Sequence, residues 1–296
     1  RCLGRFGIMP SLYISDLDGT LLASDGTLAD STRSTLARLL EDGIRFSVAT
    51  ARSVVSIQSV LAGLDLKLPV IEFNGAFISD LKSGRHEIVN AIASGVTIEL
   101  LNVIRRFDVH PFIATFDGAA DRLYHADIVN EGESFYVENR RLHRDPRLQQ
   151  TRDLAATLEE QVVCMTVIGE APRLAEIQLA VAERFADDVE MHLFENQYSP
   201  GWYWLTIHDR RATKDQAIEE VRTRYGLGDH DVVVFGDQMN DLGMFRRATH
   251  AVAVANAHPD LRRYATEVIG PNGDDSVAQF IEAHYRSSSD DVIATF

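Results

Sequence analysis

The stretch Leu12-Tyr13-Ile14-Ser15-Asp16-Leu17-Asp18-Gly19-Thr20 decides the fold, because a short apolar run delivers two carboxylates to its carboxyl end. In extended backbone, residues i and i+2 point the same way, so Asp16 and Asp18 can face one substrate together. Gly19 then frees the backbone to turn away. One aspartate can act as a nucleophile while a neighbouring acid protonates the leaving oxygen, which favours phosphoryl transfer. Taken alone, the motif could also be a solvated turn.

Strands and helices alternate at the start of the chain and again after about residue 204. Strands separated by helices predict βαβ units and a parallel sheet. The expected strands are 12–15, 44–50, 69–73, 231–235 and 251–254. One expected helix begins at residues 29–31, and four others cover residues 53–64, 214–225, 242–248 and 276–286. We therefore expect an α/β fold with a Rossmann-like, doubly wound parallel sheet as its core.

The pattern changes between these two parts, from residue 83 to about residue 200. Several strands look half-exposed, and Asp117-Gly118 joins two of them as a hairpin turn would. Segments 97–107 and 173–185 are amphipathic and predict helices. This region predicts an inserted α+β domain. The expected limits are 9–83 and 205–296 for the core domain and 84–204 for the insert.

Composition sets the broad class of protein. The chain has 296 residues, 45% of them hydrophobic and 25% charged, which is typical of a soluble globular protein. A net charge of −15 argues against nucleic acid as the main partner. Cys2 and Cys164 form no CxxC pair, which favours a reducing cytoplasm, and no apolar stretch approaches membrane-spanning length. Met9 is the expected natural start, with residues 1–8 as an upstream extension.

Chemically useful side chains follow several of the expected strands. In open parallel sheets, ligands bind outside the carboxyl ends of the strands. Taken singly, each residue has an ordinary explanation: a strand end for Thr50, a solvated lysine for Lys214, a helix cap for Asp237 and a surface position for Asp241. The segments in question are Asp16 to Asp18, Ala49-Thr50-Ala51-Arg52, Asn74-Gly75, Lys214 and Gly236-Asp237-Gln238-Met239-Asn240-Asp241.

Together these segments resemble a known family. DLDGT, ATAR, a lone lysine and GDQMND, in that order, are similar to the four motifs of the haloacid dehalogenase superfamily of phosphatases. The position of the insert resembles that of the C2B cap in the Cof-type subfamily. Segments 73–76 and 253–257 also resemble stretches of that subfamily. The resemblance extends from Met9 to about Tyr285.

The resemblance implies roles for individual residues. Asp16 would be the nucleophile that forms an aspartyl-phosphate, and Asp18 the general acid/base. Thr50 would donate a hydrogen bond to a phosphoryl oxygen, and Lys214 would neutralise the phosphoryl group and Asp16. The substrate-binding set would be Thr50, Asn74, Gly75, Lys214 and Asn240.

The resemblance also implies a magnesium site. Asp237 and Asp241 would bind the ion with Asp16 and the backbone carbonyl of Asp18. Charge supports this independently, since four carboxylates would share a pocket with Lys214, and two unit charges 4 Å apart repel by about 4 kcal/mol at a dielectric of ~20. Such a cluster would take up protons or recruit a cation, and hard oxygen ligands suit Mg²⁺.

The sequence departs from the family pattern in places. Ala51, Asp215 and Ser276 stand where glycine is usual, and Asp215 could weaken the attraction of phosphate to Lys214 or contact the substrate. In the insert, Trp202 and Trp204 could offer an aromatic surface to a sugar or simply pack one strand face.

We therefore expect a Mg²⁺-dependent phosphatase of small phosphorylated metabolites in the cytoplasm, with sugar phosphates as the expected substrates. The insert would select the substrate and exclude water. A phosphomutase of the same superfamily and a sensor of phosphorylated ligands that has lost catalysis remain alternatives. The sequence leaves open whether the protein is a monomer or a homodimer.

Overall fold

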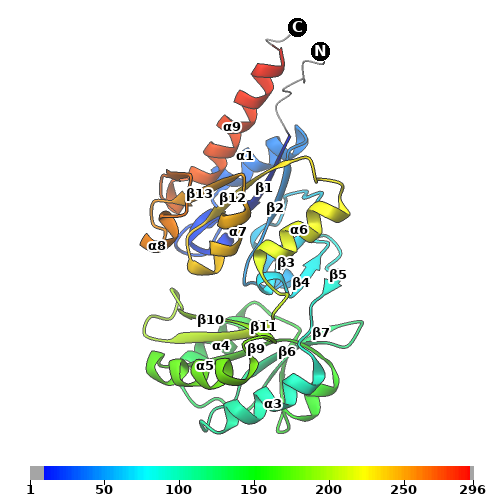
Figure 1. Cartoon of the computed structure of the whole chain (residues 1–296), viewed down its shortest axis with the longest axis vertical. Coiled ribbons are helices and arrows are strands. Elements are labelled where there is room, and N and C mark those ends of the chain that lie inside the picture. The colour runs from blue at the N-terminus through cyan, green and yellow to red at the C-terminus, as the bar shows by residue number, and fades with distance from the viewer. Residues whose placement is uncertain (1–9, 294–296) are drawn as a thin grey trace. The chain divides into compact units, whose positions relative to one another are not determined.

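The computed structural model describes residues 10–293, so Met9, residues 1–8 and Cys2 lie outside the described residues (Figure 1). The described chain forms two compact units. Unit 1 contains the residues up to Glu87 and those from Lys214 onward, and unit 2 contains Ile88–Thr213. Among the described residues, no helix combines the length and the apolar character needed to cross a bilayer.

Unit 1 is built on a five-stranded sheet in the order β14-β13-β12-β1-β2, in which every pairing is parallel. Its strands are β1 (Ser11–Ser15), β2 (Arg45–Val48), β12 (Asp231–Gly236), β13 (His250–Val254) and β14 (Glu267–Ile269). A parallel bridge between Ala49 and Ile71 links β2 to a second sheet. That sheet has the order β3-β4-β5 and consists of β3 (Val70–Glu72), β4 (Phe77–Ser79) and β5 (His86–Val89).

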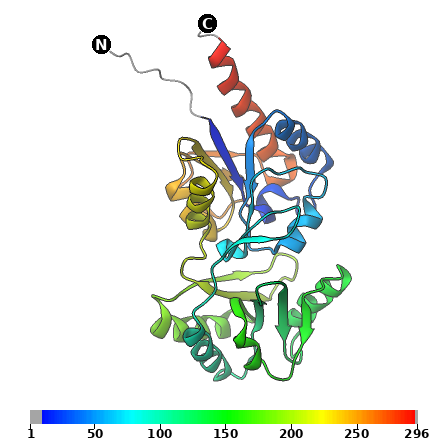
Figure 2. The ribbon, with the colours of Figure 1, turned by 90° about the vertical axis from the view of Figure 1, so that its right-hand side faces the viewer.

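Helices cover both faces of this parallel sheet. α1 connects β1 to β2, its neighbour toward one edge of the sheet. α7 connects β12 to β13, its neighbour toward the opposite edge. Right-handed crossovers therefore put α1 and α7 on opposite faces (Figure 2). α1 packs with α9, and α6 packs with α7. The helices of unit 1 are α1 (Asp30–Glu41), α2 (Val54–Val60), α6 (Lys214–Arg224), α7 (Leu242–Arg247), α8 (Pro259–Arg262) and α9 (Ser276–Ile293). The doubly wound α/β fold is confirmed.

The central strands owe their position to their sequence. β12 reads DVVVFG and is buried from its second residue to its last, as expected for a strand covered on both faces. β1 lies between β12 and β2, and its Leu12 and Ile14 are fully buried. The buried side chains of β1 and β12 therefore anchor the edge of the sheet at which these two strands end.

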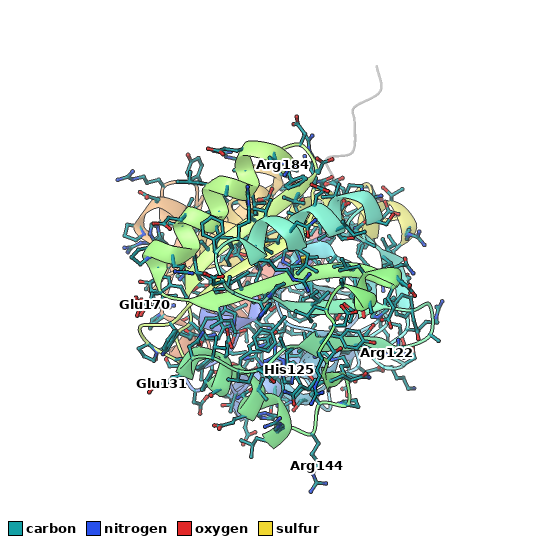
Figure 3. All side chains as sticks on the ribbon, turned by 90° about the horizontal axis from the view of Figure 1, so that it is seen from below. Arg122, His125, Glu131, Arg144, Glu170 and Arg184 are labelled. Atoms are coloured by element: carbon teal, nitrogen blue, oxygen red, sulfur yellow. The ribbon has the colours of Figure 1, made fainter. Side chains whose placement is uncertain are left out.

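Unit 2 is an α+β unit with a six-stranded sheet in the order β10-β11-β9-β6-β7-β8. α5, which carries Arg184 near its end, lies on one side of this sheet, and α4, which begins at Glu131, lies on the other (Figure 3). The hairpin around Asp117-Gly118 is present as β6 and β7. The elements are α3 (Ser94–Arg105), β6 (Phe112–Phe116), β7 (Asp121–His125), α4 (Glu131–Leu142), β8 (Leu148–Gln150), β9 (Gln161–Gly169), α5 (Ala171–Phe185), β10 (Val189–Glu195) and β11 (Tyr203–Asp209).

The structure corrects the expected limits of the insert. Residues 205–213 belong to unit 2 and not to the core, because β11 pairs antiparallel with both β9 and β10. The chain returns to unit 1 only at Lys214. At the N-terminal limit of the insert, residues 84–87 belong to unit 1, where β5 lies beside β4.

A buried histidine in unit 2 makes stability depend on pH. His208 on β11 is 1% exposed, with its Nε2 at 3.8 Å from Cys164 Sγ and its Nδ1 without a hydrogen-bond partner. Burial, assisted by His192, lowers the pKa of His208 to about 3. The unfolded chain therefore binds a proton here as pH falls below ~6.5, whereas the folded protein does not. The stability that neutral His208 contributes at pH 7 is therefore lost progressively as the pH falls from about 6.5 to about 3.

Replacing His208 by Gln is expected to reduce this pH dependence. Between pH 7.5 and pH 5, the free energy of unfolding of the wild type should fall by about 2 kcal/mol more than that of His208→Gln. Denaturant titrations at several pH values measure the difference. The exposed His110→Gln is the matched control and should follow the wild type. Parallel pH profiles of wild type and His208→Gln would contradict the assignment.

Candidate active site

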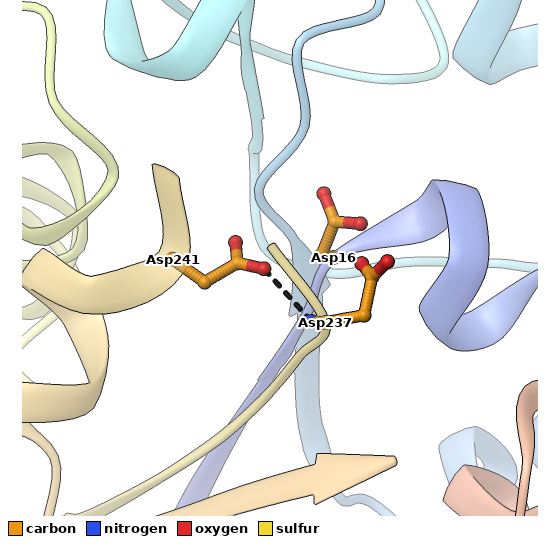
Figure 4. A group of neighbouring side chains, drawn as sticks. All are labelled: Asp16, Asp237 and Asp241. Atoms are coloured by element: carbon orange, nitrogen blue, oxygen red, sulfur yellow. Dashed lines mark hydrogen bonds between the residues drawn. The ribbon is translucent and has the colours of Figure 1, made fainter. Parts of the chain in front are cut away.

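Three aspartates converge at the carboxyl edge of the parallel sheet (Figure 4). Asp16 directly follows β1, and Asp237 and Asp241 lie in the segment after β12. One carboxylate oxygen of each lies within 4.8 Å of the others, and all three residues are buried. Because β1 and β12 are paired neighbours, their ends bring these carboxylates to one place. The expected convergence of the three residues is present.

Lys214, the first residue of α6, inserts a positive charge into this cluster. Its Nζ donates to Asp16 Oδ1 at 2.6 Å and to Asp241 Oδ1 at 2.7 Å. The side chain is 1% exposed. The helix dipole opposes a cation at this position, so the two carboxylates must hold it there. Burial lowers the pKa of Lys214, but Asp16 and Asp241 outweigh burial and the net shift is upward.

The cluster holds more carboxylates than one ammonium group can neutralise. Burial raises the pKa of Asp16 well above its ordinary value, Lys214 opposes this shift, and Asp241 and Asp237 add to it. Burial, with Asp241, also raises the pKa of Asp237 to about 7. The site therefore carries an excess of negative charge that favours either protons or a cation.

The segment after β12 is shaped around the Asp241 side chain. Asp241 Oδ2 accepts hydrogen bonds from the backbone N–H groups of Asp237 at 3.0 Å and Gln238 at 3.1 Å. A Cβ at position 236 would lie 2.6 Å from the same oxygen, so only glycine fits there. Asp241 thus orients the Asp237 backbone while its other oxygen holds Lys214.

Two residues without an assigned role support the site from either side. Thr20 Oγ1 donates to Asp237 Oδ1 at 2.9 Å, and Asn256 Nδ2 donates to the carbonyl of Gly19 at 2.7 Å. Gly19 has φ 77°, and a side chain there would clash with Asp237. Both residues stand in segments that resemble the family. Their partners could not be read from the sequence because each bond joins positions more than 200 residues apart.

Asp18 is held by Arg52 of the ATAR segment. Arg52 Nε donates to Asp18 Oδ2 at 2.6 Å, and Arg52 Nη2 donates to Asp18 Oδ1 at 2.6 Å. The ion pair is partly exposed, with side chains 19% and 30% accessible for Arg52 and Asp18. Asp18 is not part of the cluster formed by one oxygen each of Asp16, Asp237 and Asp241.

The remaining expected residues lie at the ends of neighbouring strands. Thr50 is buried, its Oγ1 accepts from the Arg52 backbone N–H at 3.2 Å, and its carbonyl accepts from the Asn74 N–H at 2.9 Å. Asn240 Nδ2 donates to Asn74 Oδ1 at 3.2 Å, which joins the β12 segment to the end of β3. Asn74 and Gly75 both have positive φ, at 56° and 113°. The strand ends are therefore hydrogen-bonded to one another around the site.

Asp215 pairs with a residue of a neighbouring helix. Its carboxylate pairs with Arg247 Nε of α7 at 2.9 Å, and its Oδ1 packs closely against Gly243. The side chain therefore links α6 to α7. In unit 2, Trp204 is buried with its ring centroid 6.2 Å from that of Tyr136, so it packs within that unit.

The residues present fit a divalent cation. Asp16, Asp237 and Asp241 offer hard carboxylate oxygens close enough to share one ion, and their negative charge exceeds that of the single ammonium beside them. Carboxylate oxygens are the ligands that Mg²⁺ prefers. A parallel sheet whose strand ends gather three buried carboxylates, a buried lysine and a turn-borne aspartate is the kind of site at which α/β enzymes bind their ligands.

Comparison with known proteins gives the family. The model of the haloacid dehalogenase-like hydrolases matches residues 13–281, so the chain belongs to that family. Its curated relatives carry phosphatase names, and the chain is accordingly a phosphoric monoester hydrolase of that superfamily.

Two relatives and one solved structure illustrate the likeness. A 5-amino-6-(5-phospho-D-ribitylamino)uracil phosphatase, YitU of Bacillus subtilis, is 24% identical over 93% of this chain and 98% of its own. Pyridoxal phosphate phosphatase YbhA of Escherichia coli is 27% identical over 91% of this chain and 96% of its own. The crystal structure of TM0651 from Thermotoga maritima has a TM-score of 0.74 and 26% identity, covering 93% of this chain and 97% of its own.

Proposed function

We propose that this protein is a Mg²⁺-dependent phosphatase that hydrolyses small phosphorylated metabolites, sugar phosphates among them, through an aspartyl-phosphate. The observation that carries the proposal is the bridge from Lys214 Nζ to both Asp16 and Asp241 beside Asp237. That arrangement would provide a nucleophile, a fixed positive charge and a ligand set for a cation in one buried place.

The cation would be held by the carboxylates of Asp16, Asp237 and Asp241 and by the backbone carbonyl of Asp18. When bound, Mg²⁺ would supply positive charge for the phosphoryl oxygens and allow an anionic substrate into an acidic site. The close approach of three buried carboxylates to a single ammonium group supports this assignment.

The protein's own side chains would carry the two chemical steps. Asp16 attacks phosphorus, the ester P–O bond breaks, and Asp18 gives its proton to the leaving oxygen. A water molecule then attacks the phosphorus of the aspartyl-phosphate, Asp18 takes its proton, and inorganic phosphate leaves as Asp16 is regenerated. Lys214 and Thr50 stabilise the equatorial oxygens during both steps.

The remaining substrate contacts are proposed to come from Asn74, Gly75 and Asn240. The bond from Asn240 to Asn74 supports this, since it fixes two amides at the ends of β3 and β12. Unit 2 is proposed to act as the cap that selects the leaving alcohol. The relatives named above act on a phosphoribityl compound and on pyridoxal phosphate, which favours small phosphorylated metabolites as the class. Cys164 is a buried free thiol, which agrees with a proposed cytoplasmic location.

Phosphate release from a panel of phosphorylated metabolites tests the proposal. With Mg²⁺ we expect turnover of p-nitrophenyl phosphate and faster turnover of at least one sugar phosphate, abolished by EDTA and restored by excess Mg²⁺. Transfer of phosphate between positions of a sugar without release would indicate the phosphomutase instead. Binding of phosphorylated compounds without any turnover would indicate a sensor, and either result would refute the proposal.

A further inference from the structure

The carboxylate of Asp18 makes a two-point ion pair. Arg52 presents Nε and Nη2 to the two oxygens at 2.6 Å each, the planar fork geometry in which a guanidinium matches a carboxylate. A two-point pair of this geometry can contribute more to stability than an ordinary surface ion pair does. Its position suggests another purpose, since Asp18 lies in the turn that also carries Asp16.

Arg52 makes three further hydrogen bonds, one from its guanidinium group and two through its backbone. Its Nη1 donates to Ser56 Oγ on α2 at 3.2 Å. Its backbone N–H donates to Thr50 Oγ1 at 3.2 Å, and its carbonyl accepts from the Phe73 N–H at 3.1 Å. The Arg52 backbone is therefore fixed at the ends of β2 and β3, and its guanidinium is anchored by Ser56. A fixed donor pair restricts the orientation of a carboxylate more than a mobile side chain does.

From this geometry we infer that Arg52 is a positioning residue for the acid/base Asp18. The inference rests on the proposed function. A carboxylate that exchanges a proton with a leaving group or a water molecule must offer one oxygen to it, and here both oxygens accept from Arg52. Before the first step one oxygen of Asp18 carries the proton that the leaving group receives, while the other oxygen accepts from Arg52 and keeps the carboxyl group oriented. Between steps the second bond re-forms. Arg52 thus acts on the reaction only through Asp18.

Kinetics of Arg52→Gln, Arg52→Lys, Asp18→Asn and the double variant Arg52→Gln/Asp18→Asn test this inference. With p-nitrophenyl phosphate and Mg²⁺, Arg52→Gln should lower kcat by about 10- to 100-fold while KM changes by less than about 3-fold, because a misplaced catalytic group costs rate more than binding. Arg52→Lys should be intermediate, since an ammonium group gives one point of attachment instead of a fork.

The double variant gives the decisive readout. If Arg52 acts through Asp18, Arg52→Gln should change the rate of Asp18→Asn by less than about 2-fold. Arg38→Gln is the matched control, because it removes a surface ion pair with Glu282 in the same unit and should leave kcat unchanged. Circular dichroism verifies folding, and Arg52→Lys decides the question should Arg52→Gln fail to fold.

Three results would overturn the inference. The first is a kcat of Arg52→Gln equal to that of the wild type, and the second is a loss in the double variant that multiplies the two single losses. The third is a rise in KM with kcat unchanged, which would make Arg52 a substrate-binding residue. Absence of phosphate release by the wild-type protein would instead refute the proposed function, and this inference with it.

Discussion

Asp16→Asn is expected to lower phosphatase turnover by roughly 10³-fold or more, because the amide cannot attack phosphorus or carry an acyl phosphate. The substitution keeps the shape of the side chain, and Lys214 retains its 2.7 Å bond to Asp241. The protein should therefore fold normally. With one buried carboxylate fewer, the cluster should also bind Mg²⁺ more weakly.

Steady-state phosphate release, with calorimetric titration of Mg²⁺ in parallel, measures both effects. Asp229→Asn is the matched control, because Asp229 is an exposed carboxylate whose side chain contacts only its neighbour His230 among the interactions described. It should retain wild-type turnover. Turnover of Asp16→Asn within 10-fold of the wild type would show that another group attacks phosphorus.

Lys214→Met is expected to affect both catalysis and stability. It removes the ammonium group from Asp16 and Asp241, so turnover should fall by about 10²- to 10³-fold, the usual effect of losing one charge-stabilising donor. It also leaves buried carboxylates without their counter-charge, a change that costs about 3–5 kcal/mol in comparable sites. Added Mg²⁺ should recover part of this stability, because it binds only the folded protein.

Thermal unfolding with and without Mg²⁺ measures the second effect. We expect a lower Tm for Lys214→Met in EDTA and a larger rise on adding Mg²⁺ than in the wild type. Lys67→Met is the control, since Lys67 is an exposed lysine paired with the exposed Asp65. An unchanged Tm in EDTA together with wild-type turnover would mean that Lys214 plays no part in either role.

The sequence predicted the convergence at the sheet edge because the rule behind it is topological. β1 and β12 are apolar enough to be recognised as buried parallel strands, and the residues after such strands meet at one edge. The positions of these strands in the sequence therefore predict that Asp16, Asp237 and Asp241 lie together. The burial of the Lys214 side chain is harder to predict, since the neighbouring residues do not distinguish a buried lysine at the start of a helix from a solvated one.

Other features depended on long-range pairing that a single sequence does not reveal. β11 is buried from its second residue to its last, which suits the core of either unit, and only its pairing with β9 and β10 assigns residues 205–213 to unit 2. Asp215 pairs with Arg247 on another helix, and Arg52 pairs with Asp18, which follows a different strand. Short strands such as β14 (Glu267–Ile269) carry too few residues for a periodic signal.

Acid quenching during turnover tests the central claim most directly. Enzyme mixed with p-nitrophenyl phosphate and Mg²⁺ is denatured within one turnover, and its peptides are mapped by mass spectrometry. The account predicts phosphate on Asp16, removed by hydroxylamine and absent from Asp16→Asn. Phosphate on another residue, or rapid turnover with no phosphorylated enzyme at any quench time, would contradict it.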